Sequence, residues 1–234
     1  MRARYNILII GCGGTGGNFA SMLGRYLYDN DVAKSCSITL VDGDYVENKN
    51  IGRQPFLPCD VGRNKAEVMA EVLTEVFGIQ CGYYPKYIDS LKDIENLEKY
   101  GYVTVIIGCV DNHACRKVLH EYFKTAPVCY YLDSANEFSS GEVVVGLKIG
   151  GKIMSPDRAI IFPEILEDKS LPRSEESCEV LNNSRPQHLA TNMLAATILF
   201  KCTVELFVEE MWNGGVYYFD TFKGSVLFKE VVQV

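Results

Sequence analysis

The chain alternates between short apolar runs and longer stretches in which apolar residues recur every three or four positions. The short runs predict buried strands, and the periodic stretches predict amphipathic helices. Strands that alternate with helices and are then followed by antiparallel strands indicate an α/β fold. We expect a Rossmann-like, mixed but mainly parallel sheet flanked by helices, with antiparallel C-terminal strands. The predicted strands are 5–10, 37–41, 80–86, 102–110, 128–133, 142–148, 216–220 and 225–231, and the predicted helices are 15–28, 63–77, 91–98, 112–124 and 187–209.

A glycine-rich turn separates the first predicted strand from the first predicted helix. Gly11, Gly13, Gly14 and Gly16 lie in this turn, and Asp42 follows the second strand. Bare backbone N–H groups and the dipole of the following helix favour a phosphate at such a turn. An acid after the second strand is placed to accept hydrogen bonds from ribose hydroxyls. The order therefore indicates a nucleotide site, although a turn that only packs strand against helix is the alternative.

The segment after Asp42 carries side chains that suit a triphosphate. Arg53 and Lys65 supply positive charge, and Asn50 and Gln54 add neutral donors. Charge builds up on the phosphates when the α-phosphorus is attacked, so a site for this chemistry needs such cations. A dinucleotide dehydrogenase has no evident need for them. Lys65 opens the helix predicted at 63–77, where the alternative is an ordinary solvated lysine.

Asp111 follows the apolar strand predicted at 102–110. Ligands of open α/β sheets bind outside the carboxyl ends of the strands. A carboxylate there, facing a triphosphate, predicts a bridging Mg²⁺, which is a hard cation with oxygen ligands. The alternative is that Asp111 only caps the next helix, because aspartate is a favoured N-cap residue.

The order of these elements resembles the ThiF/MoeB family, which includes the ubiquitin-activating enzymes. The matching elements are Gly-x-Gly-Gly-x-Gly, Asp-x-Asp, Asn-x-x-Arg-Gln, Asp-x-Gly-x-x-Lys and Cys-x-Asp-Asn. The resemblance implies ATP-dependent adenylation of the C-terminal carboxylate of a small ubiquitin-like or sulfur-carrier protein, with release of pyrophosphate. That carrier would usually end in a Gly-Gly tail. It also implies a single adenylation domain over 1–234, with a nucleotide-binding half (1–150), a crossover loop (151–186) and a C-terminal helix and strands (187–234).

Carried over residue by residue, the resemblance assigns roles within the site. Asp42 and Asp44 would hold the ribose and nearby groups, and Asp111 would lie near the metal-bound phosphates. Active homodimers of the family commonly place an N-terminal arginine in the partner's site, so Arg2 or Arg4 would have to serve here, or no residue does. Arg53, Lys65 and Asp111 are the catalytic candidates. The implied nucleotide-binding set is Gly11, Gly13, Gly14, Gly16, Asp42, Asp44, Asn50, Arg53, Gln54, Lys65, Asp111 and Asn112, with Mg²⁺ on Asp111.

The nine cysteines form no Cys-x-x-Cys pair, whereas many ThiF/MoeB proteins carry two such pairs around a structural zinc ion. We therefore predict no zinc. Cys178 lies in a polar, proline-containing segment where some family members place a thioester or persulfide cysteine. Accessibility suits a nucleophile, but Glu175, Glu176 and Glu179 would raise the pKa of this thiol. A covalent role and an incidental loop cysteine both stay open.

Composition limits the remaining possibilities. A net charge of −7 argues against a general nucleic-acid surface. No continuous apolar run reaches membrane-spanning length, and an odd cysteine count without a secretion signal predicts the cytoplasm. The helix at 187–209 is apolar on all sides, so it is either covered by its own fold or part of the interface of a predicted homodimer. His113 and His120 are predicted on a helix surface.

Three other functions remain open. The chain could be a catalytically weak, nucleotide-binding scaffold subunit that docks a carrier or an active partner. An NAD-dependent oxidoreductase would explain the glycine turn but not Arg53, Gln54 and Lys65. A related adenylating branch acts on modified tRNA, against which the acidic charge counts.

Overall fold

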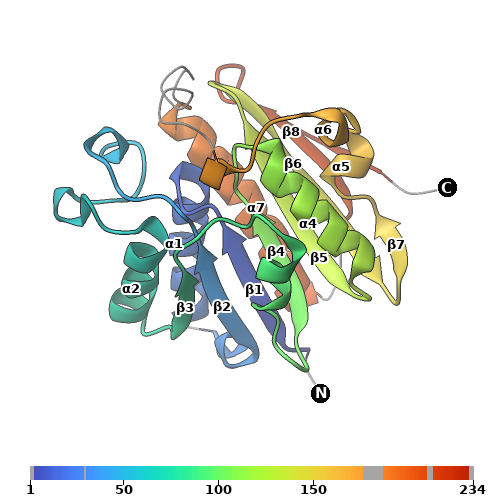
Figure 1. Ribbon diagram of the computed structural model, residues 1–234, viewed down its shortest axis with the longest axis horizontal. Helices are drawn as coiled ribbons and strands as arrows, with labels where there is room; N and C mark the ends of the chain where they lie inside the picture. The colour runs from blue at the N-terminus through green and yellow to red at the C-terminus, as the bar shows by residue number, and fades with distance from the viewer. Residues whose placement is uncertain (1–2, 29, 176–186, 210–212, 232–234) are drawn as a thin grey trace.

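The computed structural model describes residues 3–28, 30–175, 187–209 and 213–231. Within these residues the strands form one mixed sheet in the order β3-β2-β1-β4-β5-β6-β8-β9, and β7 pairs with β6 (Figure 1). The first five strands in this order pair in parallel, and all later pairs are antiparallel. The predicted fold class is confirmed. The strands are β1 (Tyr5–Ile10), β2 (Cys36–Val41), β3 (Cys81–Tyr84), β4 (Val103–Gly108), β5 (Cys129–Asn136), β6 (Ser140–Ile149), β7 (Lys152–Ser155), β8 (Gly215–Asp220) and β9 (Ser225–Glu230).

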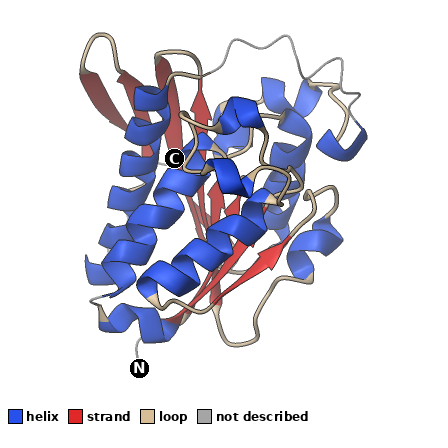
Figure 2. Ribbon diagram, turned by 90° about the vertical axis from the view of Figure 1, so that its left-hand side faces the viewer, coloured by secondary structure: helices blue, strands red, loops and turns tan. Residues whose placement is uncertain are grey.

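Helices cover both faces of the sheet (Figure 2). Strand β1 shows why, because its successive side chains enter different cores: Ile7 and Ile9 pack with α1, α2 and α7, whereas Leu8 and Ile10 pack with α3 and α4. This alternation is the two-residue period of a strand that is buried on both faces. The helices are α1 (Gly14–Tyr28), α2 (Lys65–Phe77), α3 (Leu91–Glu95), α4 (His113–Thr125), α5 (Arg158–Ile161), α6 (Glu164–Glu167) and α7 (Leu189–Glu209).

Part of the predicted crossover loop at 151–186 has regular structure. Strand β7 turns back onto β6 through Gly150 and Gly151, both with positive φ, and α5 and α6 follow it. The glycine pair is a turn signal that the prediction overlooked, and helices of one turn are too short to show a period. The strand predicted at 80–86 and the helix predicted at 91–98 are shorter than expected.

The apolar character of α7 has an explanation within the fold. This helix packs against α1, β5 and β6, and its exposed described positions, which include Met193, Thr197 and Lys201, follow one stripe. By length and mean hydropathy, 1.3 over Leu189–Phe207, α7 could also cross a membrane, although half of that stretch is buried. The prediction considered only continuous apolar runs, whereas scattered polar residues interrupt α7 without lowering its mean hydropathy enough to fail this test. A core helix passes the same test.

Candidate active site

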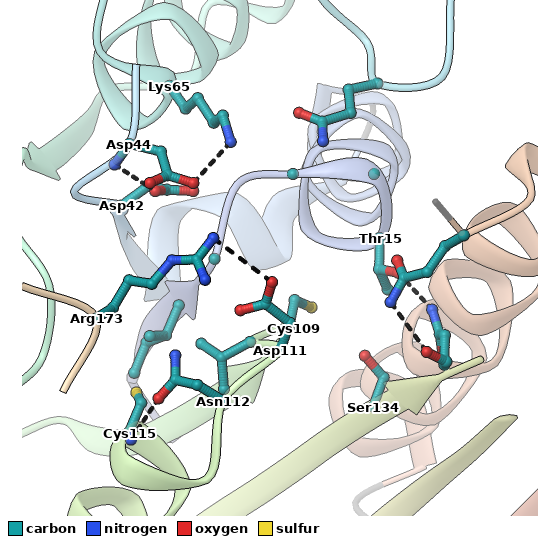
Figure 3. Close-up of a pocket in the computed structure, with 18 of the residues that line it drawn as sticks. Thr15, Asp42, Asp44, Lys65, Cys109, Asp111, Asn112, Cys115, Ser134 and Arg173 are labelled. Atoms are coloured by element: carbon teal, nitrogen blue, oxygen red, sulfur yellow. Dashed lines mark hydrogen bonds and ion pairs between the residues drawn. The ribbon is translucent and has the colours of Figure 1, made fainter. Parts of the chain in front are cut away.

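A cavity of about 720 Å³ opens at the carboxyl ends of β1, β2 and β4. The chain leaves β1 through α1 toward β2, whereas β4 pairs with the other edge of β1. Such a reversal creates the crevice in which open α/β sheets bind ligands. All predicted nucleotide-binding residues except Gly16 line the cavity, and Figure 3 shows how several of them lie. The lining members of that set are Gly11, Gly13, Gly14, Asp42, Asp44, Asn50, Arg53, Gln54, Lys65, Asp111 and Asn112.

The glycine turn is shaped by close backbone packing. Gly11 has a φ of 91°, and a Cβ atom on it would lie 2.4 Å from the carbonyl oxygen of Cys109. A Cβ atom on Gly16 would lie 1.8 Å from the carbonyl oxygen of Gly11. Gly16 is therefore needed for packing against Gly11 and does not line the cavity, unlike the other glycines predicted to bind the nucleotide. The turn therefore packs strand against helix and also exposes Gly11, Gly13 and Gly14 to the cavity, while nucleotide binding there stays a prediction.

Asp42 holds the turn in place. Its Oδ2 accepts a hydrogen bond from the backbone N–H of Cys12 at 2.7 Å, and its Oδ1 accepts one from that of Asp44 at 2.8 Å. The residue is only 9% exposed, and burial is the main cause that raises the pKa of its carboxyl to about 6. Each oxygen keeps further acceptor capacity, so the carboxylate can fix the turn and still accept from a ligand.

Lys65 is buried at the start of α2. Its Nζ lies 2.9 Å from Oδ2 of Asp44, and the Tyr87 hydroxyl donates to Oδ1 of the same carboxylate at 2.5 Å. Only 7% of Lys65 is exposed, so it is not an ordinary solvated lysine. Burial by itself lowers the pKa of Lys65, but the charges of Asp42 and Asp44 outweigh burial and raise it. The ammonium group is therefore a permanent positive charge held by a fixed element.

Asp111 does not cap α4. Asn112 is the N-cap residue, and its Oδ1 accepts from the backbone N–H of Cys115 at 2.8 Å. The Asp111 side chain is 63% exposed and lies 3.8 Å from the guanidinium of Arg173. A single carboxylate that shares a cation with phosphate oxygens is a usual Mg²⁺ arrangement. In the described part of the chain, no group of three or more His, Cys, Asp or Glu side chains could hold a metal by itself.

Three polar side chains of the loop after β2 also line the cavity, and they were predicted to contact phosphates. Asn50 is 3% exposed, and its Oδ1 accepts from the backbone N–H of Glu47 at 2.8 Å. Arg53 donates from Nε to the carbonyl oxygen of Lys49 at 2.8 Å, which orients its guanidinium along the cavity wall. The Oε1 atom of Gln54 is buried and has no hydrogen-bond partner among the described residues. An orphaned buried acceptor beside a glycine turn fits a site that a ligand completes.

Other lining residues were missed by the prediction. They lie at the start of α1, after β3, at the end of β5, in the crossover segment and just before α7. At the end of β5, the amide of Asn136 donates to Thr15 Oγ1 at 2.8 Å and to Asn192 Oδ1 at 3.2 Å, which joins β5, α1 and α7. The rule that found Asp42 and Asp111, that ligands meet the carboxyl ends of strands, also applies to β3 and β5. The missed residues include Thr15, Lys86, Tyr87, Asp89, Ser134, Asn136, Arg173 and Gln187.

The described cysteines offer no activated nucleophile in the cavity. Cys109 and Cys115 line it, but burial raises the pKa of each thiol to about 12, so both stay protonated near neutral pH. Cys178, the predicted nucleophile, lies outside the described residues, as does Arg2. Arg4 lies before the amino-terminal end of β1, away from this cavity, with its guanidinium 5.6 Å from the Tyr102 ring centroid.

His120 differs from the prediction. It is 5% exposed, and its Nδ1 lies 2.8 Å from Oδ2 of the fully buried Asp157. The surface placement predicted for this residue is therefore wrong, because α5 covers that side of α4. The pair packs α5 and does not line the cavity.

Comparisons with solved structures agree with this fold. PaaA is 14% identical, with 99% of this chain matching 65% of that one at a TM-score of 0.69. Escherichia coli MccB with ATP is 18% identical, with 97% of this chain matching 64% of MccB at a TM-score of 0.69. MccB with AMPCPP and MccA is 19% identical, with 100% of this chain matching 65% of MccB at a TM-score of 0.68. At these identities the likeness establishes the fold, and the chain spans less than two thirds of the length of these proteins.

Sequence comparison gives the family. No curated protein sequence matches the chain significantly. The family model of the ThiF family matches residues 3–222, which is nearly the whole chain. The chain therefore belongs to the ThiF family.

Proposed function

We propose that the protein uses ATP to adenylate the C-terminal carboxylate of a small protein or peptide and releases pyrophosphate. One observation carries this proposal: a single cavity combines the open glycine turn, the buried charge of Lys65 and the mostly exposed carboxylate of Asp111. Membership of the ThiF family supports it. The structures of MccB with ATP, and with AMPCPP and MccA, support a nucleotide and a peptide as the kinds of ligand.

The described side chains fit each part of this reaction. A carboxylate oxygen of the substrate would attack the α-phosphorus, and the bond to the bridging oxygen of pyrophosphate would break. Negative charge then grows on the leaving pyrophosphate, where Lys65 and Arg53 would stabilise it. Bound Mg²⁺ on Asp111 would supply further positive charge to the phosphates. Asp42 would accept from the ribose hydroxyls.

The substrate class within this proposal is a small ubiquitin-like or sulfur-carrier protein with a C-terminal glycine tail. The buried thiols of Cys109 and Cys115 favour direct release of the acyl adenylate over capture in this part of the cavity. Cys178 remains the candidate for a thioester or persulfide. A shorter peptide is the alternative substrate, because MccA is bound by MccB.

Radiolabelled ATP tests the reaction. We expect pyrophosphate and not orthophosphate to be released when the protein receives peptides that end in Gly-Gly, and hydroxylamine to trap the activated carboxylate as a hydroxamate. A panel of peptides with other C-terminal residues serves as the control for substrate class. ATP binding without any pyrophosphate release would favour the scaffold subunit, and NAD binding without ATP binding would favour the oxidoreductase.

We also propose that the protein is a cytoplasmic homodimer. Free thiols at the eight described cysteines support a reducing compartment. The packing of α7 removes the reason to place the interface there, but Val226 and Leu227 of the edge strand β9 are 53% and 66% exposed. Light scattering should show about twice the chain mass of 26.2 kDa, reduced by Leu227→Asp and not by Met193→Asp. A wild-type mass near that of one chain would contradict the dimer.

A further inference from the structure

Tyr87 lies in the segment between β3 and α3 and lines the same cavity as Asp44 and Lys65. Its hydroxyl donates to Oδ1 of Asp44 at 2.5 Å, whereas the Lys65 ammonium donates to Oδ2 at 2.9 Å. Figure 3 shows the ammonium pointing at this carboxylate. The Asp44 carboxylate is therefore held at both oxygens, by a neutral donor on one side and a charged donor on the other. The proposed reaction involves Lys65 directly and gives Tyr87 no part.

The ring of Tyr87 rests on the backbone of Gly43. A Cβ atom on Gly43 would lie within 2.7 Å of the Cγ, Cδ2 and Cε2 atoms of the ring, which is closer than side chains tolerate. The φ of Gly43 is not in the left-handed region, so its backbone conformation does not require glycine. The close approach of the ring does require it. Gly43 thus gives Tyr87 access to the turn between Asp42 and Asp44.

Backbone hydrogen bonds fix the main chain of Asp44 but not its carboxylate. Its N–H donates to Oδ1 of Asp42 at 2.8 Å, and its carbonyl oxygen accepts from the backbone N–H of Lys65 at 3.0 Å and from Nδ2 of Asn64 at 3.1 Å. Rotation about the last bond of an aspartate side chain has only broad preferences. The orientation of the carboxylate therefore depends on its two side-chain donors, Tyr87 and Lys65.

The two donors differ in what a phosphate would do to them. Burial first, and then the Asp44 carboxylate, raise the pKa of the Tyr87 hydroxyl, so it stays a neutral donor that phosphate does not attract by charge. Lys65 is a cation on a flexible stem with three N–H donors. The one side-chain hydrogen bond that it makes among the described residues goes to Asp44, so donors remain for a ligand. A ligand can thus draw on Lys65 while Tyr87 keeps Asp44 in place.

We propose that Tyr87 is a positioning residue for phosphate binding: its hydroxyl orients the Asp44 carboxylate, and this carboxylate holds the Lys65 ammonium where the phosphates enter. This inference rests on the proposed function. Without the hydroxyl, one oxygen of the Asp44 carboxylate loses its donor, and the side chain of Asp44 is only 32% exposed. The carboxylate would then turn, and the ammonium would turn with it. Tyr87 acts through Asp44 and needs no contact with the phosphates.

Calorimetry with two probes tests this role. AMPCPP with Mg²⁺ carries phosphates, and adenosine carries none. We expect Tyr87→Phe, which keeps the ring on Gly43, to weaken AMPCPP binding about tenfold, the usual loss for a hydrogen bond to a charged group, and to leave adenosine binding within about twofold. In an Asp44→Ala background the same substitution should change AMPCPP binding less than about twofold, because its acceptor is gone. The matched control is Tyr84→Phe, which removes a hydroxyl that donates to Asp93 at 3.0 Å outside the cavity lining.

The outcomes separate this inference from the proposed function. If wild type binds AMPCPP no more tightly than adenosine, the proposed function fails and the role of Tyr87 fails with it. If Lys65→Ala loses AMPCPP affinity while Tyr87→Phe keeps it, the function stands and the role of Tyr87 is refuted. The control for Lys65→Ala is Arg63→Ala, which removes an arginine that pairs with Glu71 at 2.5 Å and does not line the cavity. An equal loss for both probes in Tyr87→Phe, or an undiminished loss in the Asp44→Ala background, would also refute it, because the hydroxyl would then act by another route.

Discussion

The two walls of the cavity are built in different ways. The turn wall, which comprises the glycine turn, Asp42, Asp44 and Lys65, is held by backbone and buried contacts, and Asp42 and Lys65 are 9% and 7% exposed. The crossover wall comprises Asp111 and Arg173, whose side chains are 63% and 22% exposed and lie 3.8 Å apart. Charges on the turn wall are fixed before a ligand arrives, which is the arrangement that stabilises a transition state without reorganisation. On the crossover wall, the mostly exposed carboxylate of Asp111 is accessible to a ligand.

Removal of Lys65 should have the largest effect of any change to the turn wall. We expect Lys65→Ala to lower the rate of pyrophosphate exchange about a hundredfold, because a charge-assisted phosphate contact contributes on the order of 2–3 kcal/mol. The thermal midpoint should fall too, since Asp42 and Asp44 lose their shared counter-charge. Arg63→Ala is the control and should change neither quantity much. Equal exchange rates in wild type and Lys65→Ala would show that the turn wall does not bind phosphate.

The turn wall should also respond to pH through Asp42. Its carboxyl has a pKa of about 6 in the folded protein, against an ordinary value of 3.8. The folded state therefore holds a proton that the unfolded state has lost between these values, so this group makes folding less favourable as pH rises from about 4 to 6. The affinity for a nucleoside should change in the opposite direction and increase as pH rises through about 6, because ribose hydroxyls need the ionised carboxylate as acceptor.

Adenosine affinity measures this second effect. It should be constant above pH 7 and fall about tenfold at pH 5, where about a tenth of Asp42 is ionised. Calorimetry between pH 5 and 8 gives the profile, and the absence of phosphates from this probe leaves Arg53 and Lys65 out of the comparison. A flat profile would mean that Asp42 only fixes the turn and does not contact the ribose.

The sequence predicted the turn wall better than the crossover wall, and the reason is physical. Gly11, Asp42 and Lys65 act through local structure: a strand end, a turn and a helix start, each with its own pattern. Arg173 reaches the cavity because α6 packs on α4 and Lys117 holds Asp168, and no local pattern reports such long-range contacts. The same reason explains His120, whose burial depends on α5. The parallel pairing of the first strands could be predicted because apolar runs alternate with helices.

Asp111 and Asn112 show where sequence reasoning stops at a single residue. Both side chains are favoured at a helix N-cap, but the prediction considered only Asp111 as a cap and began the helix at 112. In the structure Asn112 accepts from the backbone N–H of Cys115, and this frees Asp111 to face Arg173. A shift of one residue in the start of α4 would have exchanged the two roles.

Alanine at each of these neighbours gives the smallest expected effect and separates the two roles. Asn112→Ala should lower the free energy of unfolding by about 1 kcal/mol, the usual loss for an N-cap. Asp111→Ala removes a mostly exposed side chain, so its effect on unfolding should stay within about 0.5 kcal/mol. The order reverses for AMPCPP binding with Mg²⁺, which Asp111→Ala should weaken more than Asn112→Ala does. Denaturant unfolding ranks the two variants by stability, and calorimetry ranks them by AMPCPP affinity. A larger loss of stability in Asp111→Ala would assign the cap to Asp111 and remove its carboxylate from the crossover wall.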